Sequence, residues 1–260
     1  MKRLSSSTIR PKRGFAHVAH IFLTALLPVV LLVFIRMGFP LLAVALLLLS
    51  KWRMFAVRAR YWYSNLLANA VDIIVGLSFL SFVHSAESLS FQLVWVVLYV
   101  CWLVLLKPRS DSLSVTAQAF IGQAAGLAMA GREFVHLYHV SIPLLSSEFL
   151  FILSVWVICY TSARHFLTVF EDDDTDMLSA LWAFGISSLA WILSHWFLLY
   201  KGYVPQLAVI ASLLGYGLGA IYYLDQKERL SQRVLRQYVL FIVIGLVVII
   251  ALSDWQYHVI

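Results

Sequence analysis

The sequence predicts an all-α fold, a polytopic integral membrane bundle of about nine transmembrane helices with the N-terminus inside and the C-terminus outside. Hydrophobic residues make up 62% of the 260 residues and charged residues 12%, whereas soluble domains average roughly 45–50% and about 25%. The apolar residues form continuous runs rather than the alternating pattern of a membrane barrel. The basic residues between these runs fall almost wholly on alternate sides, as loops kept in the cytoplasm do.

The chain divides into nine apolar stretches, and we treat residues 1–260 as a single transmembrane domain. A membrane-spanning helix needs about 20 apolar residues, and seven of the stretches meet or approach this length. The first pair is the weakest part of the assignment, because Arg36–Pro40 leaves little room for a turn and the second run is short. The predicted spans are 18–35, 37–51, 64–84, 91–106, 113–131, 147–166, 177–200, 203–224 and 238–252.

The distribution of basic residues favours nine spans over eight. With nine, 16 of the 19 Lys and Arg residues lie on the cytoplasmic side, and only Arg36, Arg132 and Lys201 lie on the other. If segment 37–51 did not cross, the N-terminus would flip and the ratio would worsen from 16:3 to 11:8. We therefore predict nine crossings.

The same charges indicate where the protein is located and what surrounds it. A basic start followed by an apolar run resembles a secretory signal, but no small-residue cleavage site follows, so we expect a retained first helix in a bacterial cytoplasmic membrane. The net charge of +6 comes from short juxtamembrane loops, which favours anionic lipid headgroups as partners over nucleic acid. Protein partners are beyond the sequence.

Asp72 is the most unusual residue within a predicted span. Inserting a helix into the membrane with an aspartate at its centre costs about 2.5–3.5 kcal/mol for that residue. Asn65, Asn69, Asp72 and Gly76 follow one another at spacings of 4, 3 and 4, which places them on one helix face. This polar intramembrane face indicates an ion, proton or headgroup site reached from the cytoplasm; the alternative is a structural seam in which Asp72 pairs with a basic residue or is protonated.

The run Glu171–Asp176 is the dense acidic segment of the chain. Its Asp172, Asp173 and Asp176 are a candidate cation site, because closely spaced carboxylates can bind Mg²⁺ together with a diphosphate. The simpler interpretation is a solvated loop that pairs with neighbouring basic residues, or a helix N-terminus enriched in acids.

In position and spacing this acidic run resembles the second aspartate-rich motif of the intramembrane aromatic prenyltransferases. That family has nine helices, the same orientation, and this motif between helices six and seven, where Asp172 and Asp176 lie here. The first motif of the family, N-D-x-x-D-x-x-x-D, is absent, and Asn69-x-x-Asp72 lies inside a span. The resemblance implies an enzyme using Mg²⁺ on an isoprenoid diphosphate, and it assigns no catalytic residue.

Two further patterns carry weaker hypotheses. His136 and His139 are spaced i, i+3 on the outer side and could hold Zn²⁺ or Cu²⁺, although scattered interfacial histidines explain them more simply. Gly122 with Gly126, and Gly215 with Gly219, have the spacing that lets membrane helices approach closely.

These features leave three functions open. The leading one is a transporter or permease-like protein whose pathway includes the polar face around Asp72. The alternatives are a prenyltransferase-like enzyme acting at loop 171–176, with Mg²⁺ as cofactor, and a noncatalytic scaffold subunit. The missing first motif favours a protein that is not an enzyme, and substrate and oligomeric state cannot be read from the sequence.

Overall fold

The computed structural model describes residues 14–138, 147–170, 174–195, 199–200 and 204–252, and these residues are almost entirely helical. Within these residues, nine α-helices follow one another, with two 3₁₀ turns, one π-helical turn and one pair of two-residue strands between or beside them. The helices are α1 Phe15–Arg36, α2 Pro40–Ser50, α3 Trp62–Ser85, α4 Leu89–Cys101, α5 Ser112–Tyr138, α6 Ser147–Leu167, α7 Thr175–Ser194, α8 Gln206–Gln226 and α9 Gln232–Leu252. The shorter elements are η1 Trp52–Phe55, η2 Ala59–Tyr61, the π-helical η3 Trp102–Leu106, β1 Leu199–Tyr200 and β2 Val204–Pro205.

The composition of these helices makes the chain a multi-pass transmembrane helical protein in contact with the lipid bilayer. Within the described residues, seven helices are long and apolar enough to cross a membrane, and these are α3 to α9. The apolar parts of α1 and α2, Ile21–Arg36 and Pro40–Ser50, are shorter. Each predicted apolar stretch thus corresponds to a helix, seven of them with the length and hydropathy of a span.

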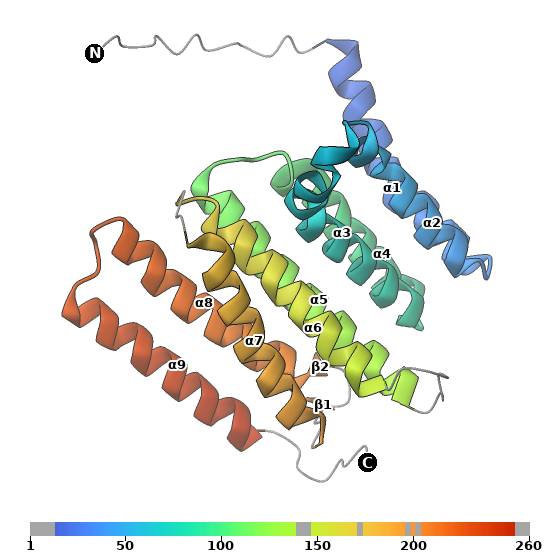
Figure 1. Ribbon diagram of the computed structural model, residues 1–260. Helices are drawn as coiled ribbons and strands as arrows, with labels where there is room; N and C mark the ends of the chain where they lie inside the picture. The colour runs from blue at the N-terminus through green and yellow to red at the C-terminus, as the bar shows by residue number, and fades with distance from the viewer. Residues whose placement is uncertain (1–13, 139–146, 171–173, 196–198, 201–203, 253–260) are drawn as a thin grey trace, which may run out of the picture.

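Successive helices run in opposite directions, so the connections gather at two ends of the bundle (Figure 1). The α2–α3, α4–α5, α6–α7 and α8–α9 connections lie at one end, which we call the basic end. Among the described Lys and Arg residues, only Arg36 and Arg132 belong to the opposite end. The charge asymmetry read along the sequence is therefore also an asymmetry in space.

The turn between α1 and α2 is short, as the sequence led us to expect, and it comprises residues 37–39. Gly38 has φ +81 with open space around it, a conformation that glycine adopts without steric cost. Pro40 starts α2 at a position where its missing N–H costs little. Because the turn is this short, α1 and α2 form an antiparallel pair. Arg36 at the end of α1 also donates a hydrogen bond to Gln92 Oε1 of α4 (3.2 Å).

Three predicted boundaries differ from the structure by six or seven residues, and one of them is the start of α9, which begins at Gln232 rather than at 238. Segment 113–131 continues to Tyr138 in α5, past the charged Arg132 and Glu133, where Glu133 accepts a hydrogen bond from Ser81 of α3 (2.5 Å). Segment 177–200 ends as a helix at Ser194, and Leu199–Tyr200 pairs with Val204–Pro205 as antiparallel strands. These differences all lie at the ends of apolar segments, where hydropathy is a poor guide to helix boundaries.

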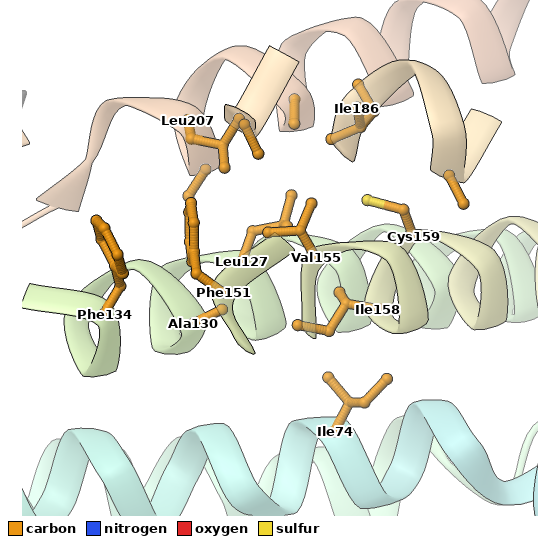
Figure 2. Close-up of a cluster of buried hydrophobic side chains, with 14 residues drawn as sticks. Ile74, Leu127, Ala130, Phe134, Phe151, Val155, Ile158, Cys159, Ile186 and Leu207 are labelled. Atoms are coloured by element: carbon orange, nitrogen blue, oxygen red, sulfur yellow. The ribbon is translucent and has the colours of Figure 1, made fainter. Parts of the chain in front are cut away.

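The side chains buried inside the bundle form two main clusters. One cluster consists of side chains from α1, α2, α3, α4 and η3, packed around Leu31, Leu47 and Val83. The other joins α5, α6, α7 and α8, and Ile74 reaches it from α3 on the side away from Leu207 (Figure 2). Because lipid is as apolar as these side chains, close packing rather than burial from water holds such helices together. Helix α3 thereby contacts both clusters and connects the halves of the bundle.

Asp111 caps the start of α5 and supplies a pH-dependent contribution to stability. Its Oδ2 accepts a hydrogen bond from the backbone N–H of Ser114 (3.1 Å), and hydrogen bonds from Ser114 lower the pKa of this exposed carboxyl below its usual 3.8. A lowered pKa stabilises the fold above the unfolded-state value, and that contribution is lost as the pH falls through the folded-state value. We expect the wild type to lose more stability than Asp111→Asn between about pH 6 and about pH 3, measured by thermal unfolding in detergent; an equal loss would contradict this role.

Candidate functional site

Asp72 lies at the centre of a buried charged cluster contributed by three segments of the chain. Its Oδ2 contacts the ammonium groups of Lys51 and Lys107, the latter at 2.7 Å. Its Oδ1 accepts a hydrogen bond from the indole N–H of Trp102 (3.0 Å). Both carboxylate oxygens are thus satisfied, which a buried aspartate in a membrane helix requires.

Helix ends place the two lysines beside α3. Lys51 immediately follows α2, whose 11 residues bring it down from the opposite end of the bundle. Lys107 follows the π-helical turn η3, where its N–H bonds to the carbonyl of Trp102 (2.8 Å). This i→i+5 bond widens the last turn and directs both Trp102 and Lys107 toward Asp72, in keeping with the frequent presence of π-turns at functional sites.

Asn65 of the predicted polar face joins the segment after α2 to α3, whereas Asn69 bonds within α3. The amide of Asn65 donates to the carbonyl of Met54 (3.0 Å), and that of Asn69 donates to the carbonyl of Asn65 (2.8 Å). One turn beyond Asp72, Gly76 faces Leu47 and the hydroxyl of Tyr99. The face predicted from spacing therefore packs against α2, η1 and α4, and it is open only at the asparagines.

A cavity of about 330 Å³ lies at the open part of this face. Its lining is Ser50, Lys51, Met54, Asn65, Asn69 and Lys107. The volume is at the lower end of the roughly 300–1,000 Å³ usual for small-molecule pockets, and most of the lining groups are polar. Only 5% of the Lys51 side chain is exposed but 38% of Lys107, so Lys107 is the cation that a ligand in the cavity would meet first.

The cluster contains more positive than negative charge. Two lysines share one carboxylate, so the three ionised groups carry one net positive charge. A buried ion is costly unless it is fully paired, and the excess here sits beside the cavity. An anion entering the cavity would balance it.

Directly beyond Asp72 the side chains packed between α2, α3 and α4 are mostly apolar. Leu47, Val75, Phe79 and Val83 are buried together there, and Phe79 stacks on the ring of Tyr99 at 4.5 Å. The Tyr99 hydroxyl is buried and has no hydrogen-bond partner among the described residues. The polar cavity is therefore open at the basic end and closed above Asp72.

Half of the acidic run Glu171–Asp176 lies outside the described residues. Asp172 and Asp173 lie outside them, and Asp176 lies in the first turn of α7. The carboxylate of Asp176 accepts from Arg164 Nε (2.7 Å) and from the Tyr160 hydroxyl (3.3 Å). This carboxylate thus has partners on α6, as the solvated-loop interpretation expects, and the Mg²⁺ hypothesis stays a prediction.

The histidine hypothesis is likewise left as a prediction. His136 lies in α5 with a side chain outside the described set, and His139 lies outside the described residues altogether. Among the residues that the structure does describe, no three His, Cys, Asp or Glu side chains come together as a metal site.

The four glycines lie where helices approach closely. A Cβ on Gly122 would be 2.6 Å from Val71, and one on Gly126 would be 2.6 Å from Ile74 and 2.8 Å from Ile158. Gly215 and Gly219 of α8 face α5 in the same way, with Gln123 and Phe120 at 2.7 and 2.6 Å. Gln123 also donates to the Ala211 carbonyl (3.0 Å) across this contact.

Sequence reasoning found Asp72 but did not name its partners. Lys51 and Lys107 were counted only among the basic residues of the cytoplasmic side, and Trp102 was not singled out, although each of the two lysines ends an apolar run on the same side as the start of α3. That shared position was the available signal. Comparison of the chain with protein-family models, with curated proteins and with solved structures gives no match.

Proposed function

We propose that this membrane protein is permease-like and that its Lys51–Asp72–Lys107 cavity binds the anionic group of a substrate, a phosphate in the first place. The observation that carries the proposal is the presence of two lysines around one aspartate at the wall of a polar cavity. Lysine binds phosphate as a compact point charge, and hydrogen bonds between charged groups are about twice as strong as neutral ones.

The asparagines favour an oxygen-rich ligand. Each carboxamide NH₂ has two donors, and within the described residues one donor of Asn65 and one of Asn69 is used by a backbone carbonyl. The remaining N–H groups can donate to phosphate oxygens in the cavity. Lys107, more exposed than Lys51, supplies the direct charge contact.

The shape of the site supports a permease over a scaffold. Alternating access exposes a substrate site to one side of the membrane at a time, and this cavity is open at the basic end and closed by apolar side chains above Asp72. By the distribution of lysines and arginines, the basic end would face the cytoplasm.

Replacing Lys107 by methionine tests the proposal. Lys51 still pairs with Asp72 in this variant, so the fold is retained while the accessible cation is removed. We expect the affinity for sn-glycerol 3-phosphate or inorganic phosphate to fall about tenfold or more, the equivalent of one charged hydrogen bond. Isothermal titration calorimetry on detergent-purified protein measures it.

The matched control is Lys227→Met, which removes an exposed lysine at the same end of the bundle, near the Tyr223 ring. It should bind phosphate as the wild type does. Absence of phosphate binding in the wild type, or equal losses in the two variants, would refute a specific anion site.

A further inference from the structure

An apolar cavity of about 380 Å³ lies beside the polar one, between α4 and α5. Both helices pack on α3 but hardly touch each other, so α3 forms the floor through Val75 and Phe79. The side chains at its mouth, among them Leu98, Leu105 and Ile121, are about half exposed. We call this cavity the α4–α5 groove; it opens toward lipid.

The groove adjoins the polar cavity at two points, at Trp102 and at the step from Leu106 to Lys107. The ring of Trp102 lines the groove while its N–H binds Asp72. Leu106 lines the groove and the next residue, Lys107, lines the polar cavity. A single molecule could therefore place a charged group at Lys107 and an apolar chain along α4.

The length of the groove matches one leaflet of a bilayer. Its lining on α4 and η3 extends from Trp95 to Leu106, roughly 16 Å at 1.5 Å per residue. Half of the hydrocarbon core of a bilayer is about 15 Å. The charged cavity lies at the end of the groove that belongs to the basic end, where lipid headgroups lie.

We infer that the ligand of this protein is an anionic phospholipid, with its phosphate at Lys51 and Lys107 and one acyl chain in the α4–α5 groove. This inference rests on the proposed anion site and adds the class of its substrate. The charge excess selects anionic over zwitterionic headgroups, because a zwitterion brings its own cation to the two lysines.

Quenching of tryptophan fluorescence by lipids brominated in the chain tests the inference, because Trp95 and Trp102 line the groove. Wild-type protein in nanodiscs should be quenched more, by about twofold, by brominated phosphatidic acid than by brominated phosphatidylcholine at equal mole fraction. Trp95→Phe should reduce that difference, and Lys107→Met should abolish it.

Filling the groove separates the chain from the headgroup. Ala125→Phe, or Ile121→Phe at the mouth, should remove the preference for phosphatidic acid while leaving the binding of sn-glycerol 3-phosphate within twofold of the wild type. Ala251→Phe, at an exposed position of α9, is the control and should change neither.

The outcomes distinguish this inference from the proposed function. Equal quenching by the two lipids, with intact binding of glycerol phosphate, would overturn the lipid ligand and leave the anion site for a soluble substrate. If the wild type showed neither the lipid preference nor binding of glycerol phosphate, the anion site itself would be overturned.

Discussion

Asp72→Asn is expected to lower the free energy of unfolding by about 3–5 kcal/mol, the usual cost of removing one partner from a buried ion pair. The substitution keeps the size of the side chain but leaves Lys51 and Lys107 side by side without an anion. Only 5% of the Lys51 side chain is exposed, so most of the repulsion stays inside the bundle. Thermal or denaturant unfolding in detergent micelles measures the loss.

The double variant Lys51→Met/Asp72→Asn is the matched control. Replacing both members of a buried pair by groups of similar volume is often neutral, and Lys107 is exposed enough to be solvated alone. The double variant should therefore be more stable than Asp72→Asn. If Asp72→Asn were as stable as the wild type, the carboxylate would not be paired as the structure describes.

The single variant Asp72→Asn also distinguishes two roles for Asp72, as the ligand of a cation or as part of an anion site. If Asp72 itself held a transported cation or proton, Asp72→Asn would lose ligand binding. With an anion site, the variant has two uncompensated lysines, so added phosphate should stabilise it at least as much as it stabilises the wild type. Loss of the phosphate effect in a folded Asp72→Asn protein would favour the cation interpretation.

The sequence predicted the helices because the physics that forms them is local. Continuous apolar runs and the alternation of basic loops indicated nine helical segments, and the structure has a helix at each. The exceptions lie at the ends: α5 continues beyond Arg132 because Glu133 finds Ser81 on α3, and a short strand pair replaces the end of segment 177–200. Such contacts between helices leave no periodic signal in one segment.

The site was predictable only in part for the same reason. An intramembrane aspartate must have a partner or reach water, so Asp72 could be singled out from one segment. Its partners come from two other segments, and Trp102 and Lys107 depend on a π-turn that hydropathy does not indicate. The membrane orientation, the single domain, the acidic loop and the histidine pair stay predictions.

Gly126→Ala is expected to destabilise the bundle by about 1–3 kcal/mol, the usual cost of overpacking a well-packed core. Gly126 lies where α3, α5 and α6 meet, and its missing side chain leaves room for Ile74 on one neighbour and Ile158 on the other. Both isoleucines are buried and β-branched, with restricted χ1 rotation. Neither can move without displacing its helix, so the added methyl group would separate α5 from a neighbour.

Gly185→Ala is the matched control, since Gly185 also lies in a helix but has nothing within 4 Å of an added Cβ. Alanine there should be neutral or stabilising by up to about 1 kcal/mol, the difference in helix propensity. The sign of the change in the free energy of unfolding distinguishes the two causes, because a general effect of alanine on helices would change the stability of both variants in the same direction. Opposite signs in unfolding experiments would locate the cost in the contact of α5 with α3 and α6, whereas equal effects would mean that close helix approach at Gly126 contributes nothing to stability.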